Sequence, residues 1–154
     1  MNLNQFIGRS QLSAMRSACR GEEGEYFRTM IENLKKTIAA MPKPYETDGQ
    51  GDEAFATLHY FKGGSDWWII ERDQEGDQYQ AFGFACLNGD YLNAEMGYIS
   101  IEELIQYGVE LDLYYTPEKI GDIRARHEPD AMYRNKKSPS QAATQEEEII
   151  NPQP

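Results

Sequence analysis

The residues best suited to chemistry lie in one short stretch of the sequence. Its polar half carries the carboxylates Glu46, Asp48 and Asp52, and His59 follows in a segment typical of a strand. Hard cations such as calcium prefer clustered carboxylates, and a carboxylate or an imidazole can transfer protons during hydrolysis. One hypothesis is therefore a small metal-assisted or acid–base hydrolase that uses the loop and strand of residues 46–59.

More specific tests count against a metal in this stretch. A calcium loop of the EF-hand type beginning at Asp48 needs glycine at its sixth position and glutamate at its twelfth, where this chain has Glu53 and His59. Zinc needs three or four ligands at short spacing, which His59 lacks. We expect a solvated connector, a structural or surface histidine and no cofactor, with Glu46, Asp48 and Asp52 left as the candidates for a cation.

Cysteine chemistry is also not expected. Cys86 lies among apolar residues within an acidic region, which raises the pKa of a thiol, whereas an activated thiolate needs positive surroundings. The chain contains no phosphate-binding loop and no nucleophile-elbow or metalloprotease motif. The sequence therefore favours a protein that is not an enzyme. The two cysteines form no CxxC motif, and the first residues lack the apolar core of a signal peptide, so we expect a reduced, cytoplasmic protein.

Charge is distributed unevenly along the 154 residues, whose formal net charge is -11. Residues 1–44 hold seven bases and four acids, whereas residues 45–112 hold fifteen acids and two bases. Such a region repels nucleic acid and anionic membranes and attracts basic protein surfaces. We therefore expect a basic protein partner, no direct binding of nucleic acid and no membrane. In the alternative interpretation, the acids form a solvated face that serves solubility alone.

Aromatic residues crowd the same acidic region. Trp67 and Trp68 are adjacent, so a regular strand directs them to opposite faces of a sheet, one into the core and the other exposed or covered by a helix. An exposed aromatic ring among acids suits a protein contact. The candidate contact residues are Trp67, Trp68, Asp73, Glu75, Asp77, Asp90 and Glu95.

Periodicity predicts the elements that position these residues. An apolar stripe at helical spacing predicts a helix over 22–41, ended by Pro42. Ser100 and Glu103 form a capping box for a short helix, and Thr116 with Pro117 predicts another helix start. Further expected elements are a helix at 10–19 and strands at 55–61, 67–73, 79–87, 95–99 and 109–115.

Together these elements predict an α+β fold. We expect N-terminal helices packed on a four- to five-stranded antiparallel sheet, then short C-terminal helices. The domain spans 1–133, with a helical part at 1–44 and a sheet core at 55–123. Residues 134–154 are polar and contain proline, and are expected to form a flexible tail.

Several motifs resemble a known family. They are "LHYF" (58–61), "DWWIIERD" (66–73), "AFGFACL" (81–87), "GYISIEEL" (97–104) and "ELDLYYTP" (110–117). In order and spacing they resemble the phage- and plasmid-borne family catalogued as domain of unknown function 2958, over about residues 55–123. The resemblance implies a mobile genetic element in a bacterial host and transfers no catalytic residue. The resulting hypothesis is a small acidic accessory protein that binds a host or element-encoded protein, with counter-defence or DNA mimicry as its role.

Overall fold

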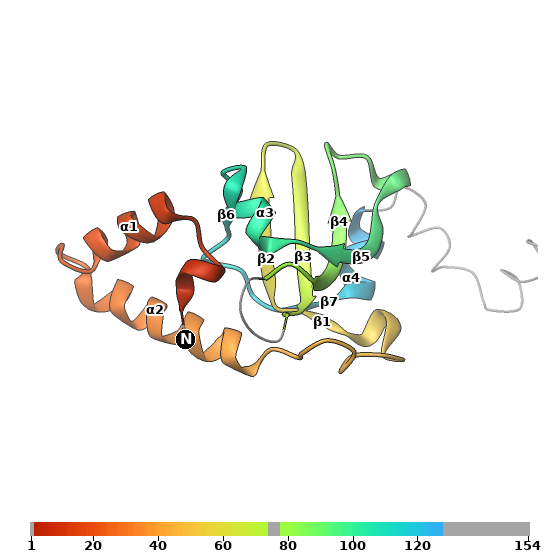
Figure 1. The fold of residues 1–154 in the computed structure, drawn as a ribbon, viewed down its shortest axis with the longest axis horizontal. Coiled ribbons are helices and arrows are strands. Elements are labelled where there is room, and N and C mark those ends of the chain that lie inside the picture. Colours follow the sequence, from red (N-terminus) through yellow and green to blue (C-terminus); the bar gives the residue numbers. More distant parts are fainter. Residues whose placement is uncertain (1, 74–77, 128–154) are drawn as a thin grey trace, which may run out of the picture.

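The fold is centred on a five-stranded antiparallel sheet with helices on both sides (Figure 1). The computed structural model describes residues 2–73 and 78–127. The α+β class and the antiparallel sheet are confirmed. The expected tail at 134–154 lies outside the described residues.

Two helices form an arm beside the sheet, at the left of Figure 1. They are α1 (Arg9–Ala18) and α2 (Gly24–Ala40), preceded by the short 3-10 turn η1 (Leu3–Gln5). The apolar stripe predicted for the second helix is only half-buried over much of its length, and Ile38 near its end is fully buried. The start of α2 packs mainly on α1, while its end reaches the sheet core.

The main sheet has the strand order β5-β4-β3-β2-β6. Its hairpin between β2 and β3 turns at Gly63, whose φ of 57° suits glycine. The hairpin register pairs His59 with Trp68. The strands are β2 (Leu58–Lys62), β3 (Ser65–Glu71), β4 (Ala81–Cys86), β5 (Glu95–Ile99) and β6 (Glu110–Leu111).

Smaller elements cover the far side of this sheet. A two-stranded ribbon joins β1 (Phe55–Ala56) to β7 (Glu118–Lys119), and α4 (Ile120–His127) follows directly. The 3-10 turns are η2 (Gly51–Glu53) and η3 (Tyr91–Asn93). The short helix α3 (Ile101–Gln106) contributes instead to the core on the side of α1 and α2.

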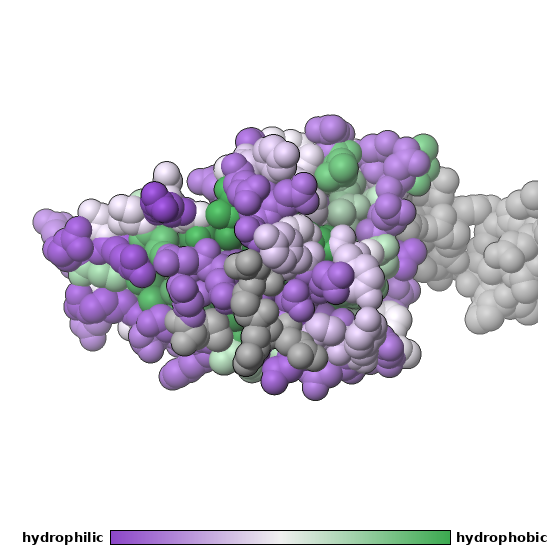
Figure 2. Space-filling model, in the orientation of Figure 1, coloured by the Kyte–Doolittle hydropathy of each residue, from purple (hydrophilic) through white to green (hydrophobic). Residues whose placement is uncertain are grey.

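The sheet has an apolar core on each face. Trp67 packs against the core shared with α1, α2 and α3, whereas Trp68 belongs to the core shared with α4. The prediction that the two indoles point to opposite faces is therefore confirmed. On the face seen in Figure 2, hydrophilic residues prevail, and hydrophobic residues show in separate small areas.

Three predicted elements differ from the structure. The expected strand at 55–61 is divided at Thr57, because Phe55 and Ala56 pair with β7 rather than with β3. The strand at 109–115 is only β6, because the Asp112 carboxylate accepts a hydrogen bond from the Tyr114 N–H (3.0 Å) and turns the chain. The helix expected to begin at Pro117 begins at Ile120, after β7.

Candidate functional site

The acids of the 46–59 stretch do not converge on one site. Glu46 accepts a hydrogen bond from the backbone N–H of Lys43 (2.5 Å), within its own loop. Asp52 pairs with Arg124 of α4 (3.3 Å). Its neighbour Glu53 pairs with Lys119 of β7 (2.9 Å) in the same way, while Asp48 is exposed. Asp52 and Glu53 therefore attach the loop to α4 and β7, and the acids point to different partners.

His59 is held by two carboxylates from other parts of the chain. Its Nε2 lies 2.8 Å from Asp66 Oδ1, and its Nδ1 lies 3.2 Å from Asp112 Oδ2. A general base needs a ring nitrogen within reach of the substrate proton. Both nitrogens of His59 already meet carboxylates, so the geometry gives this residue a structural role.

His59 is one member of a column of aromatic rings. Its imidazole stacks on Trp68, with centroids 5.2 Å apart, and the ring of His127 lies 5.1 Å from the same indole in a tilted arrangement. Tyr91 stacks on His127 at 5.1 Å, and Phe61 continues the column beyond His59. The column joins β2, β3, η3 and the end of α4, so its contribution is to packing.

The other reactive groups are buried or scattered. Burial, reinforced by Asp66 and Asp90, raises the pKa of the Cys86 thiol, as expected from its sequence surroundings. Among the described residues, no group of three or more His, Cys, Asp or Glu is arranged to hold a metal ion.

The predicted contact residues divide into four groups. Trp68 is 3% exposed, so it cannot serve as a surface anchor, and Trp67 is half-buried against the helical side. The Asp73 carboxylate accepts a hydrogen bond from the Gln80 N–H (3.2 Å), which orders the end of the sheet. Asp90 and Glu95 are exposed. The remaining two, Glu75 and Asp77, lie outside the described residues.

A surface missed by the sequence analysis is built on a buried carboxylate. Glu71 at the end of β3 is 4% exposed. It accepts hydrogen bonds from the N–H groups of Tyr45 (2.9 Å) and Thr47 (3.0 Å) and from the Thr47 hydroxyl. These bonds hold Tyr45 at a φ of 71°, a backbone conformation that non-glycine residues seldom adopt.

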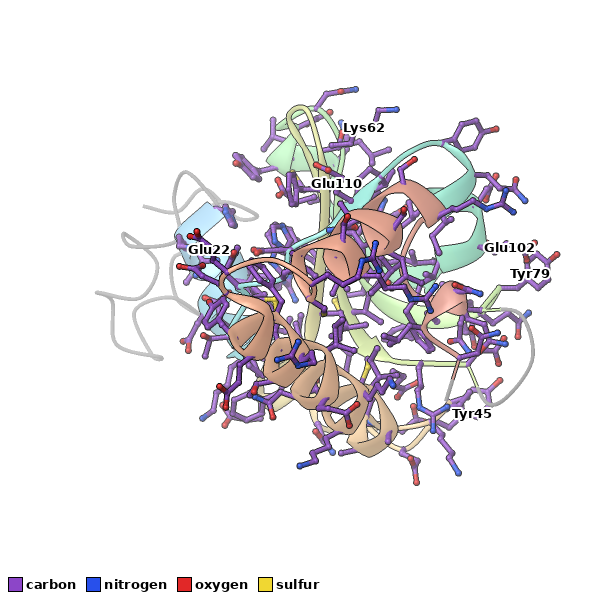
Figure 3. All side chains as sticks on the ribbon, turned by 90° about the vertical axis from the view of Figure 1, so that its left-hand side faces the viewer. Glu22, Tyr45, Lys62, Tyr79, Glu102 and Glu110 are labelled. Carbon is purple, nitrogen blue, oxygen red and sulfur yellow. The ribbon has the colours of Figure 1, made fainter. Side chains whose placement is uncertain are left out.

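This strained tyrosine lies exposed beside a second one. Tyr45 is 67% exposed and Tyr98 of β5 is 59% exposed. Their hydroxyl oxygens lie 3.5 Å apart, and Tyr98 packs edge-on against Phe82 of β4. The hydrogen bond with Tyr45, together with the charges of Glu71 and Asp48, raises the pKa of Tyr98. We call Tyr45 and Tyr98 the tyrosine pair. In Figure 3, Tyr45 lies at the opposite end of the molecule from Lys62 and Glu110.

The tyrosine pair adjoins an open edge of the sheet. β5 is an end strand, and no backbone hydrogen bond joins it to any described segment except β4. The opposite end strand, β6, is closed by a side chain. The Gln11 amide donates to the Leu111 carbonyl (2.7 Å) and accepts from the Leu111 N–H (3.0 Å).

These contacts were largely hidden in the sequence because they join distant residues. Glu71 alone carried a signal, as a charged residue directly following the apolar pair "II" in a predicted strand.

No protein-family model matches the chain, and no curated protein or solved structure matches it either. The resemblance to the domain of unknown function 2958 family therefore stays a prediction. None of the described helices is both long and apolar enough to span a membrane.

Proposed function

We propose that the protein binds a basic, arginine-bearing segment of a partner protein at the tyrosine pair and along β5. The observation that carries this proposal is the exposure of Tyr45 in a strained conformation, held by three hydrogen bonds to buried Glu71. Residues that the surrounding structure holds in a strained backbone conformation cluster at active sites, ligand-binding segments and switch regions.

The chemistry of the surface indicates the partner. Tyrosine rings offer flat faces on which a guanidinium stacks, and tyrosine is enriched at the centres of protein interfaces. Asp48 lies close enough to Tyr98 for its charge to raise the pKa of that tyrosine, and β5 itself contains no Lys or Arg. A basic partner is thus attracted, and an acidic one is repelled.

The backbone of β5 supports an extended partner segment. In an antiparallel end strand, alternate residues direct their N–H and C=O groups away from the sheet, where an added strand can pair with them. Gly97, in the middle of β5, has open space where a side chain would lie. This face of β5 is therefore uncovered at Gly97, which leaves room for the side chains of an added strand.

DNA mimicry has less support, because many of the acids are used inside the fold. Asp66 and Asp112 contact His59, Asp52 pairs with Arg124, and Glu71 is buried. The sequence resemblance suggests the setting, and on that basis we propose an accessory protein of a phage or plasmid whose partner is a host or element-encoded protein.

A defined peptide tests the proposal. A short peptide alternating Arg and Val should bind the wild-type protein, and binding should weaken as salt is added. We expect the variant Y45A/Y98A to bind at least tenfold more weakly. The matched control Y107A/Y114A removes two tyrosines that are equally exposed but lie away from the pair. Equal losses in the two variants, or no binding by the wild type, would refute the proposal.

The same variants then identify the natural partner. Tagged wild-type and Y45A/Y98A proteins are incubated with bacterial lysate, and captured proteins are compared by mass spectrometry. The partner is a protein with a basic surface that the wild type and Y107A/Y114A retain and Y45A/Y98A loses. Identical captures from all three baits would count against the surface.

A further inference from the structure

A hollow beside α1 gathers three arginines in an otherwise acidic protein. Its volume is about 350 Å³. The lining residues are Asn4, Arg9, Leu12, Ser13, Arg16 and Arg20. Leu12 is buried at its base, and the polar lining residues are exposed. The hollow lies on the helical arm, and none of its lining residues belongs to the surface proposed above, so an inference about it stands independently.

The arginines of this hollow have no acidic partner among the described residues. In contrast, Lys35, Lys119, Arg124 and Arg126 each form an ion pair. The chain has 26 acids for 15 bases, yet residues 1–21 contain no Asp or Glu. Unneutralised guanidinium groups converging on one hollow create a positive site, and guanidinium is the group that recognises phosphate oxygens in a bidentate manner.

The start of α1 adds to this positive potential. Its N-cap residue Gly8 has no side chain to accept hydrogen bonds from the first N–H groups of the helix. Arg9 then places a positive charge at the positive end of the helix dipole, where an acid is normally favoured. An anion bound beside Arg9 would offset this unfavourable charge.

We propose that this hollow binds a small ligand carrying two or more linked phosphate groups. Arg9 and Arg16 are seven residues apart on α1, roughly 10 Å at 1.5 Å per residue, and Arg20 follows the end of the helix, so the arginines extend beyond the size of one phosphate. The volume falls in the range of small-molecule sites. A nucleic acid strand fits less well, because the net charge of -11 repels a long polyanion.

Calorimetric titration tests the proposal on the full chain in 0.15 M salt, with tripolyphosphate, pyrophosphate and orthophosphate as probes. We expect tripolyphosphate to bind most tightly and orthophosphate most weakly. The variant R16A/R20A should lose at least tenfold in affinity for tripolyphosphate. The control K36A/K43A removes the same charge from exposed lysines outside the hollow and should change affinity less than twofold. Both variants alter exposed side chains, and circular dichroism checks that they fold.

A second measurement reports where the probe binds. The side-chain Nε–H signals of Arg9, Arg16 and Arg20 should shift in nitrogen-15 NMR spectra when tripolyphosphate is added. Absence of heat with tripolyphosphate would overturn the proposal, as would equal losses in the arginine and lysine variants. Tighter binding of a 15-nucleotide single strand than of tripolyphosphate would also overturn it, because the ligand would then be a nucleic acid.

Discussion

The imidazole of His127 lies against the indole of Trp68, with ring centroids 5.1 Å apart, and this contact attaches the end of α4 to the sheet. Burial, followed by the charge of Arg126, lowers the pKa of His127 below its ordinary value of 6.5. As the pH falls through 6.5, the unfolded chain takes up the proton first, while the native state resists it. This contribution to the free energy of unfolding is therefore greatest above pH 6.5 and decreases as the pH falls toward the native pKa.

The variant H127F tests this dependence, since phenylalanine retains a ring at the position but cannot be protonated. We expect chemical denaturation between pH 8 and pH 5 to show a smaller loss of stability in H127F than in the wild type. His59 is present in both proteins, so the difference between the two curves isolates His127. Parallel curves would show that His127 does not contribute to the pH dependence of stability.

Two paired glycines should respond differently to the same substitution. Gly83 of β4 and Gly97 of β5 lie opposite one another. A Cβ atom at Gly83 would collide with the backbone carbonyl of Trp68, whereas one at Gly97 would meet nothing within 4 Å. We expect G83A to lose about 3 kcal/mol or more of stability and G97A to stay within about 0.5 kcal/mol of the wild type. Urea unfolding measures both, and equal effects would contradict the packing.

Replacing Glu71 by glutamine should free the loop that carries Tyr45. An amide keeps the shape but brings an NH₂ group toward N–H donors and loses charge-assisted hydrogen bonds. We expect E71Q to lose about 2 kcal/mol of stability and to expose the loop to hydrogen exchange. The control E22Q changes an exposed glutamate ahead of α2 and should alter neither quantity. Unchanged exchange at Tyr45 and Thr47 in E71Q would contradict the role of the carboxylate.

The contribution of the Gln11 side chain, which closes β6, should also be measurable. Truncation in Q11A removes both hydrogen bonds to Leu111. We expect a loss of about 1–2 kcal/mol in the free energy of unfolding and faster exchange of the Leu111 amide. Q106A removes an exposed glutamine from α3 and serves as control. Slow exchange at Leu111 in Q11A would show that another group protects this edge.

The sheet was predictable because its signals are local. The strand at 95–99 has the bounds expected, and the β2–β3 hairpin follows from two aromatic runs around "KGG". Cys86 is buried, as its apolar surroundings indicated. The helix predicted over 22–41 is present as α2, with slightly narrower bounds. It was predictable because its apolar stripe extends over several turns.

Two predictions were wrong because an interaction that the sequence pattern does not show decided the structure. Residues 109–115 alternate as a strand should, but Asp112 turns the chain after β6. Strand pairing between β1 and β7 likewise prevailed over the helix-start signal of Thr116 and Pro117. The Asp112 turn is a local effect, whereas the β1–β7 pairing could not be predicted from neighbouring residues because Phe55 and Lys119 are far apart in the sequence.

The candidate surfaces depend on contacts of the same long-range kind. Glu71 and Tyr45 are separated by 26 residues, and Gln11 and Leu111 by 100. A contact candidate chosen for its residue type, Trp68, is in the core because two histidines and α4 cover it.

The unequal edges of the sheet limit how copies of this chain can stack. Endless edge-to-edge growth, as in a fibril, requires that each copy offer two free edges, one on each side. In the described part of the chain, β5 offers one, while the Gln11 amide occupies the other at Leu111. Pairing through β5 therefore ends after two sheets have joined, so the edge available for recognition does not also propagate aggregation.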